Sequence, residues 1–361
     1  MQIPTDPDAL TAGWLTAALR QGGAINRAAV TAFKAEPLAE DKGFYGQISR
    51  LSLEYDLAEA DAPRSLIAKF ASATPEMRQR SIPSYEREVR FYQQLARQTT
   101  LPTPTCYYGD IDTETGFHIL LLQDLAPARS GSRVEGASPD QAELAIRHIA
   151  RFHATWWESP QLEEISWLLA TTTKFDYDGL EARHNQWWPE FYRQAKHRLP
   201  DSIKEIGARL GRRRADIIRH LASPPQTLIH SDYQLDNLIF GEPEGGVPFA
   251  VIDWQFVRQG RGIWDVAYFL CQNLEPEDRR TVETDLLRAY HQILLDNDIQ
   301  GYTFAQCLHD YRLSLLHRLG ALISTIAAMP FTQEQIQMHI DVLLPRCIAA
   351  ILDHQAGELL T

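Results

Sequence analysis

The sequence contains few cysteines and no segment typical of a targeting or membrane sequence. Its four cysteines are widely separated among 361 residues and form no CxxC or CxxH pattern, which disfavours a disulfide framework or a zinc site. The N-terminal residues lack both a basic start and an apolar core, and no apolar run approaches the length of a transmembrane helix. We therefore expect a cytoplasmic protein with reduced thiols and no membrane partner.

An excess of positive charge is also missing. The formal net charge is −12, which disfavours nucleic acid and anionic membranes as partners because both attract basic surfaces. The hydrophobic content of 44% and the charged content of 23% are ordinary for a soluble globular protein. A length of 361 residues is enough for two lobes with a large buried core.

A polar loop between two short apolar segments organises the second half of the chain. Residues 228–229 and 238–240 are predicted to form buried strands, and the loop between them carries three polar side chains, His230, Asp232 and Asn237. A further apolar strand ends on Asp253. Phosphoryl transfer from ATP requires such a set, in which one carboxylate accepts the proton of the attacking hydroxyl while an Asn and a second Asp hold Mg²⁺.

The motif His230-x-Asp232-x4-Asn237, followed by Ile252-Asp253, resembles the aminoglycoside phosphotransferase and choline kinase-like superfamily. Residues 262–270 are similar to a segment of its ecdysteroid-kinase-like and small-alcohol kinase branches. The resemblance implies an α+β, protein-kinase-like fold of two lobes. Residues 1–124 would form a small β-rich lobe that binds ATP, and residues 125–361 would form a larger, mostly helical lobe for catalysis and substrate binding.

The motif predicts a role for each polar side chain in the loop. Asp232 would accept the proton of the acceptor hydroxyl, Asn237 and Asp253 would bind Mg²⁺, and His230 would brace the loop by hydrogen bonds. Asp236 is the competing carboxylate of the loop. Because Asp236 does not match the position of the base, a structural role or contact with a substrate amine is the preferred interpretation.

An apolar strand over residues 65–70 contains one lysine, Lys69. A buried ammonium usually has a partner, because burial without one costs several kcal/mol. The kinase-like arrangement would place Lys69 on the α- and β-phosphates, and Glu88 is its expected partner because it borders the apolar stripe of the helix predicted from about residue 84 to 97. A lysine on an edge strand, pointing to solvent, is the alternative.

Two further segments are candidates for nucleotide contacts. Gly43 and Gly46 lie between two predicted strands, where glycines allow the backbone to approach phosphates, although a plain hairpin turn would also explain them. Residues 123–125, which include Gln123 and Leu125, resemble the family's hinge between lobes, whose backbone binds adenine.

The acceptor is the least determined part of the prediction. Residues 158–200 carry many aromatic side chains that could line a pocket for a partly apolar acceptor, but ordinary helix packing explains them better. Residues 138–157 are predicted to form a helix in which His153 is a core histidine. We expect an ATP-dependent kinase that phosphorylates a hydroxyl of a small molecule. A protein kinase and a nucleotide-binding module without activity are the alternatives, and the oligomeric state is not predicted.

Overall fold

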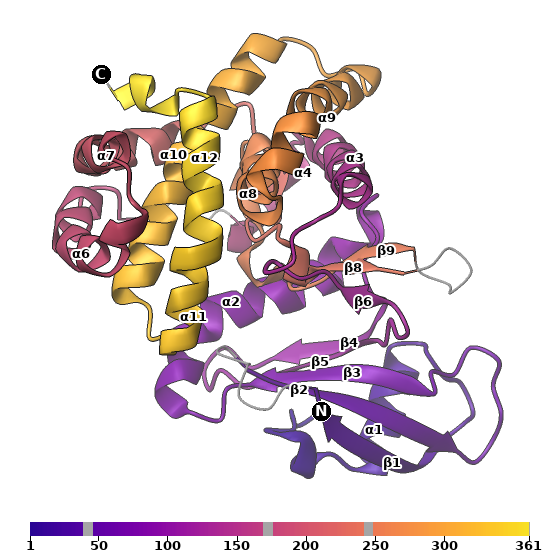
Figure 1. Ribbon diagram of the computed structural model, residues 1–361. Coiled ribbons are helices and arrows are strands. Elements are labelled where there is room, and N and C mark those ends of the chain that lie inside the picture. Colours follow the sequence, from indigo (N-terminus) through magenta and orange to yellow (C-terminus); the bar gives the residue numbers. More distant parts are fainter. Residues whose placement is uncertain (39–45, 169–175, 242–247, 361) are drawn as a thin grey trace. The chain divides into compact units, whose positions relative to one another are not determined.

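The computed structural model describes residues 1–38, 46–168, 176–241 and 248–360. The chain divides into two compact units, the first formed by Met1–Arg129 and Ile239–Phe256 and the second by Ser130–Leu238 and Val257–Thr361. The first unit is built on a β-sheet and the second is mostly helical (Figure 1), which confirms the predicted α+β class. The predicted lobe boundary after residue 124 remains a prediction. The prediction assigned residues 239–256 to the second lobe, whereas the structure groups them with the first unit.

A five-stranded antiparallel sheet forms the centre of the first unit, in the order β1-β2-β3-β5-β4. Burial alternates along much of β2 and β3, whereas β5, an inner strand, is buried almost throughout. Their bounds are Val30–Pro37 (β1), Gly46–Tyr55 (β2), Ser65–Ala71 (β3), Cys106–Ile111 (β4) and His118–Gln123 (β5).

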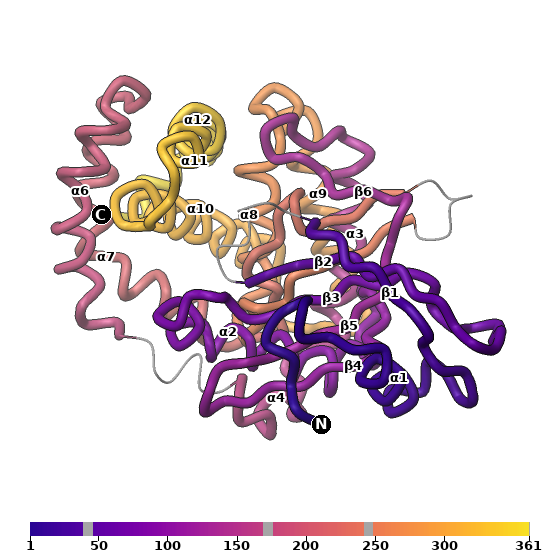
Figure 2. Tube along the Cα trace, turned by 90° about the horizontal axis from the view of Figure 1, so that it is seen from below, coloured from indigo at the N-terminus to yellow at the C-terminus, as the bar shows by residue number. Residues whose placement is uncertain are grey.

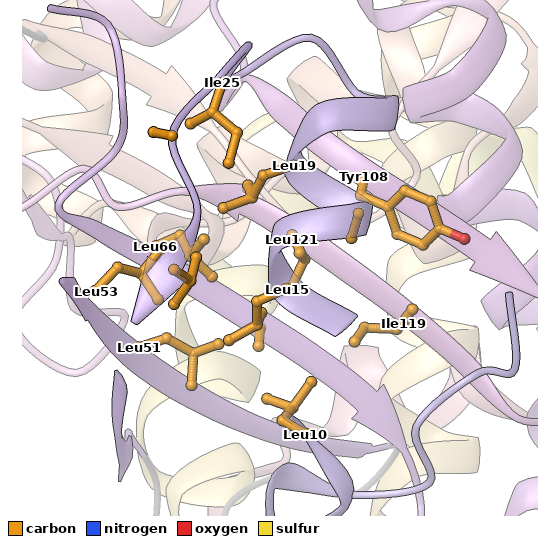
Figure 3. Close-up of a cluster of buried hydrophobic side chains, with 14 of the residues drawn as sticks. Leu10, Leu15, Leu19, Ile25, Leu51, Leu53, Leu66, Tyr108, Ile119 and Leu121 are labelled. Atoms are coloured by element: carbon orange, nitrogen blue, oxygen red, sulfur yellow. The ribbon is translucent and has the colours of Figure 1, made fainter. Parts of the chain in front are cut away.

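Helix α1 (Ala12–Gln21) packs on one face of this sheet. Leu15 and Leu19 of the helix meet Leu51, Leu66 and Leu121 of three strands in a buried apolar cluster (Figure 3). Burial of side chains of this size contributes about 1.5–3 kcal/mol each. The cluster therefore fixes which face of β3 is turned toward α1.

In the sequence, Asp6 followed by Pro7 predicts a helix over residues 6–21 with Asp6 as its N-cap, but the start of α1 differs from this prediction. Asp6 instead caps a short 3₁₀ turn, Pro7–Ala9, and the helix begins at Ala12, where the Thr11 side chain accepts a hydrogen bond from the Trp14 amide. Two competing caps lie close together in the sequence, and extended backbone at Leu10 and Thr11 separates them.

Helix α2 (Pro75–Gln94) contacts β4 and β5 and carries Glu88. It begins nine residues earlier than the predicted start near Ser84, because Pro83 does not end it. Tertiary contacts offset the cost of a proline inside the helix. In the first half of α2, the Arg78 guanidinium lies 4.2 Å from the Phe117 ring centre and Gln79 donates a hydrogen bond to the Thr115 carbonyl.

A small sheet and a short turn complete the described part of the first unit. Strands β6 (Arg129–Ser130), β8 (Leu238–Phe240) and β9 (Phe249–Val251) form a three-stranded sheet in the order β6-β8-β9. A 3₁₀ turn, η6 (Trp254–Phe256), follows β9 and contacts α2.

The second unit consists mainly of helices, together with the short antiparallel pair β7 (Thr227–Ile229) and β10 (Arg258–Gly260). Helices α6 and α7 lie side by side, as Figure 2 shows. The helices are α3 (Pro139–Trp156), α4 (Gln161–Glu164), α6 (Leu180–Ala195), α7 (Asp201–Leu221), α8 (Ile263–Asn273), α9 (Pro276–Asp296), α10 (Phe304–Ala328), α11 (Gln333–Met338) and α12 (Leu344–Asp353). Short turns are η3 (Lys196–Arg198), η4 (Leu235–Asn237), η7 (His339–Leu343) and η8 (Ala356–Leu360).

Helix α3 agrees with its prediction. Ser138 and Gln141 form a capping box at its start, and His153 is fully buried within it, as predicted for a core histidine. Two aromatic residues of α6 follow the packing interpretation, whereas Tyr192 is exposed. Phe191 is buried, and the Trp188 ring occupies the space that a side chain at Gly207 of α7 would need.

The amphipathic pattern of residues 332–356 predicts one C-terminal helix, but the structure divides this segment into α11, the π-helical turn η7 and α12. Contrary to the sequence expectation, Gln333–Asp353 is long and apolar enough to cross a membrane by length and composition alone. Half of this segment is buried inside the protein. Core helices of soluble proteins commonly meet the same criterion.

Candidate active site

Lys69 of β3 lies at the centre of a charged cluster in the first unit. Its Nζ is 2.6 Å and 2.8 Å from the two carboxylate oxygens of Glu88 and 3.2 Å from Oδ1 of Asp253. Alternation along β3 explains the direction of Lys69, since Leu66, Ala68 and Phe70 enter the core under α1. The predicted Lys69–Glu88 pair is present, and the edge-strand alternative is wrong.

The two carboxylates determine the charge of Lys69. Burial by itself lowers the pKa of Lys69, but Glu88 and Asp253 outweigh this effect and raise it above its ordinary value. The ammonium therefore stays protonated at every physiological pH. A permanent cation fixed by a buried carboxylate is suited to binding phosphate oxygens.

Asp253 is held by the turn that follows it. The Trp254 ring is fully buried and stacks on Phe91 of α2 at a centroid distance of 3.8 Å, while Gln255 Nε2 donates to Asp253 Oδ2 at 3.1 Å. Asp253 itself has φ +67°, an uncommon conformation for a residue with a side chain. Such strain persists only where surrounding contacts enforce it, and it is frequent at functional sites. The same helix, α2, thus supports both carboxylates that face Lys69.

The predicted hinge contains a polar clamp that sequence reasoning missed. Asp124 accepts hydrogen bonds from Arg50 Nε at 2.7 Å and from the Ser65 hydroxyl at 2.5 Å. These contacts fix the end of β5, where Gln123 pairs with Leu66 of β3. The roles of Gln123 and Leu125 in binding adenine remain predictions.

The structure describes only one of the two glycines that were predicted to contact phosphates. Gly43 lies outside the described residues. Gly46 begins β2, where a side chain would lie 2.4 Å from the Phe70 carbonyl oxygen, so strand packing alone requires a glycine there. Its predicted contact with phosphates remains a prediction.

In the second unit, three donors hold the carboxylate of Asp232. Asn237 Nδ2 lies 2.9 Å from Oδ2, Gln234 Nε2 lies 3.1 Å from the same oxygen, and the Tyr268 hydroxyl lies 3.0 Å from Oδ1. Burial, followed by the charge of Asp232, raises the pKa of Tyr268 and keeps this hydroxyl protonated. Tyr268 was not identified from the sequence as a site residue. It is located on α8, three residues after Asp265, and helical periodicity places both on the same side of that helix.

Asp265 supports the backbone of the same loop. Its carboxylate is fully buried and accepts hydrogen bonds from the amides of His230 at 2.7 Å and Ser231 at 2.8 Å. His230 in turn accepts the Asp232 amide on Nδ1 at 3.3 Å, a bracing contact of the kind predicted for it. Ser231 has φ +69°, an uncommon conformation for a residue with a side chain, so the loop backbone is strained at this residue.

Asp236 faces away from the base. Its carboxylate pairs with Arg133 Nε at 2.6 Å and also accepts the Arg133 backbone amide at 3.2 Å. The charge of Asp236 is therefore already neutralised within the second unit. This pairing supports the structural role and leaves Asp232 as the better candidate base.

Each unit offers an oxygen ligand of the kind that a hard cation such as Mg²⁺ prefers. Asp253 offers a carboxylate, and Asn237 turns its Nδ2 to Asp232, so its Oδ1 is the atom that would bind a metal. Another group, His220, His309 and Asp310, has ligand atoms within 4.8 Å of one another. Asp310 already pairs there with Arg261 Nη1 at 2.6 Å, which satisfies it without a metal.

The antiparallel sheet with its Lys69–Glu88 pair and the supported loop from His230 to Asn237 are the features of a kinase-like fold. The chain belongs to the phosphotransferase enzyme family, whose model matches residues 53–305. It is 24% identical over 233 residues to an uncharacterized kinase-like protein of Caenorhabditis elegans. That match covers 63% of this chain and 61% of the relative, so the chain spans less than two thirds of the relative's length.

Solved structures show the same fold at low sequence identity. A microcompartment-associated aminopropanol kinase has a TM-score of 0.55 and 15% identity, with 96% of this chain and 100% of that chain covered. The GDP complex of an aminoglycoside 2'-phosphotransferase has a TM-score of 0.51 and 11% identity, with 94% and 100% covered. Family and fold together identify a kinase-like phosphotransferase and confirm the superfamily resemblance.

Proposed function

We propose that this protein transfers the γ-phosphate of ATP to a hydroxyl group of a small molecule. The observation that carries the proposal is the contact of Lys69 with both Glu88 and Asp253. A nucleotide-binding fold needs a cation for the phosphates and a carboxylate for the metal, and β3, α2 and the turn after β9 bring both together in the first unit.

Each residue has a distinct role in the proposed mechanism. Lys69, held by Glu88, binds the α- and β-phosphates, and the backbone of Gln123 and Leu125 binds the adenine. Asn237 and Asp253 would hold Mg²⁺, which when bound supplies positive charge against the phosphate oxygens. Gly43 and Gly46 are proposed to bring the backbone close to the phosphates.

Asp232 is the proposed general base. Its carboxylate accepts the proton of the acceptor hydroxyl and directs that oxygen toward the phosphorus. The three donors around Asp232 restrict its rotation, and restricted geometry is the main contribution a protein makes to phosphoryl transfer. His230 positions the loop and transfers no proton.

The proposed setting follows from the same chemistry. ATP is abundant in the cytoplasm, where we place the protein. The partner is a small hydroxyl acceptor, and the net charge of −12 argues against a nucleic acid.

Two variants test the proposal in a screen that measures ATP consumption over a panel of alcohols. Asp232→Ala should lower kcat about 10²–10⁴-fold while Mg·ATP binding survives, because only the base is lost. Asp253→Ala should lose the Mg²⁺ dependence of nucleotide binding. Asp285→Ala removes an exposed carboxylate of α9 and serves as the control.

The outcomes separate the proposal from the alternatives. If both variants turned over as fast as the unaltered protein, the assigned residues would be wrong. A protein that binds Mg·ATP but phosphorylates no alcohol in the panel would be a binding module. Phosphorylation of peptides in preference to alcohols would identify a protein kinase.

A further inference from the structure

Three arginines and two aromatic rings lie next to the base loop in the second unit. We call Arg214, Arg258, Arg318, Trp264 and His317 the arginine cluster. The Arg258 guanidinium lies 4.2 Å from the Trp264 ring centre, and the Trp264 and His317 ring centres are 3.9 Å apart. These residues come from α7, β10, α8 and α10, so the cluster is formed by the tertiary structure.

The cluster adjoins Asp232 at two points. The Arg318 guanidinium lies 3.4 Å from the centre of the Tyr268 ring, whose hydroxyl contacts Asp232. Arg258 Nε donates to the Ser231 hydroxyl at 2.9 Å, one residue before Asp232. Arg318 is therefore one aromatic side chain away from the proposed base, and Arg258 contacts the residue before it.

Arg214 is the most unusual member because it is only 6% exposed. Its Nε and Nη1 have no hydrogen-bond partner, and no carboxylate of the described residues lies within 4 Å of its guanidinium. The group lies against Gly320 of α10, where a side chain would come within 2.8 Å of Nε.

Other buried donors of the cluster also have no acceptor within the part of the chain that the structure describes. They are Nε of Arg318, Nε1 of Trp264 and Nδ1 of His317. Each buried donor without a partner costs about 1–3 kcal/mol, and a buried charge costs more. Ordered water or a bound ligand usually satisfies such groups, and several of them next to a proposed base mark a candidate ligand site.

The electrostatics agree with an anion as this ligand. Burial, followed by the charge of Arg183, lowers the pKa of Arg214 to about 10, so it remains a cation at neutral pH. Burial and the charges of Arg318, Arg258 and Arg214 hold the pKa of His317 well below its usual range. His317 is therefore neutral, and the positive charge of the cluster belongs to the arginines.

We propose that the acceptor is an alcohol that also carries a carboxylate or phosphate group, and that Arg214 and Arg318 bind this anionic group while Asp232 faces the hydroxyl. This inference rests on the proposed function, because it names the substrate class of the same site. Guanidinium groups bind both kinds of anion through paired N–H donors. A cationic amino alcohol would be repelled by the same arginines.

The test measures binding to the full-length protein, so that it does not depend on turnover. Four compounds share one carbon skeleton: 4-hydroxybutanoate, 4-hydroxybutyl phosphate, 4-aminobutan-1-ol and butane-1,4-diol. Calorimetry or ligand-observed NMR gives the affinity of each, with and without Mg²⁺ and a non-hydrolysable ATP analogue. At least one anion should bind about tenfold more tightly than the diol, and the amine should bind no more tightly than the diol. The tighter of the two anions shows whether the group is a carboxylate or a phosphate.

A matched pair of variants assigns the effect to the cluster. Arg214→Met should reduce anion affinity to that of the diol and leave the melting temperature unchanged or higher, because an unpaired buried charge is removed. Arg212→Met removes an exposed charge from the same helix and should keep the preference. Arg318→Met provides a second variant if Arg214→Met does not fold.

Three results would overturn the inference: anions that bind no better than the diol, a preference that survives both Arg214→Met and Arg318→Met, or a preference that disappears when the ATP analogue occupies the nucleotide site. In each case the proposed kinase activity could still stand if another alcohol is phosphorylated. Conversely, failure to bind Mg·ATP would contradict the proposed function and leave the anion measurement readable.

Discussion

The pair formed by Lys69 and Glu88 permits a prediction that separates stability from function. Replacing Glu88 by Leu leaves the Lys69 ammonium buried, with side-chain exposures of 17% for Lys69 and 4% for Glu88 in the unaltered protein. Loss of one partner of a buried ion pair costs about 3–5 kcal/mol. Asp253 remains 3.2 Å from Lys69, so we expect a cost near the lower limit, about 3 kcal/mol.

The double variant Lys69→Met/Glu88→Leu should recover most of this loss. Apolar side chains of similar volume remove the desolvation cost of both charges, and such replacements are often neutral or stabilising. The double variant should therefore unfold within about 1 kcal/mol of the unaltered protein. Its affinity for Mg·ATP should nevertheless fall about tenfold or more, because the cation for the phosphates is gone.

The assay must report on the first unit alone. Hydrogen exchange of peptides that span β3 and the second half of α2 gives the local opening free energy, and calorimetry gives nucleotide affinity. The exposed pair Lys34–Glu36 on β1, replaced in the same way, is the control and should show no measurable change in opening free energy. The reasoning would be refuted if Glu88→Leu cost no more than the control, or if the double variant were as unstable as Glu88→Leu.

Three further predictions concern the base, acid stability and packing. Tyr268→Phe should lower kcat about tenfold or more and leave the KM for ATP unchanged in steady-state kinetics, since it removes a hydrogen bond to the Asp232 carboxylate; an unchanged kcat would contradict this role. Burial, followed by the charge of Lys69, lowers the pKa of His118 to about 3, so between pH 6.5 and 3 the unfolded chain binds a proton that the folded state does not. His118 should thus lower the free energy of unfolding by about 1.4 kcal/mol per pH unit as the pH falls through this window. In acid unfolding, the free energy of unfolding of His118→Phe should fall less steeply with pH than that of the unaltered protein. Gly22→Ala should lower the melting temperature strongly, because its side chain would lie 1.5 Å from a backbone oxygen of β4. Gly13→Ala, in open space within α1, should raise the melting temperature. Equal effects of the two variants would contradict the packing described for α1.

Local periodicity predicted the parts of the site that lie on single elements. A single lysine within an apolar strand and the 100° spacing of α2, together with the family resemblance, selected Lys69 and Glu88, and the two are in contact. The loop motif likewise indicated Asp232 and Asn237, which hydrogen bond to each other. These features depend on the order of residues within one strand, helix or loop, which a sequence displays directly.

Features that depend on contacts between distant elements could not be predicted in this way. The clamp at Asp124 joins Arg50 and Ser65, which are 74 and 59 residues away. Helix α2 was predicted to start near Ser84, but it starts at Pro75, and its first half contacts the turn before β5. Helical periodicity places Tyr268 on one face of α8, but it does not predict what that face contacts. The contact of Tyr268 with Asp232 depends on the packing of α8 against the loop.

Helix α8 carries both the carboxylate that accepts the loop amides and the hydroxyl that contacts the base. A single rigid element therefore sets the shape of the loop and the direction of its reactive group. Substitutions outside α8 that leave its packing against the loop intact would preserve both groups. Such a separation of duties would allow descendants of one ancestral enzyme to adopt new alcohols while the proton-accepting geometry stays constant.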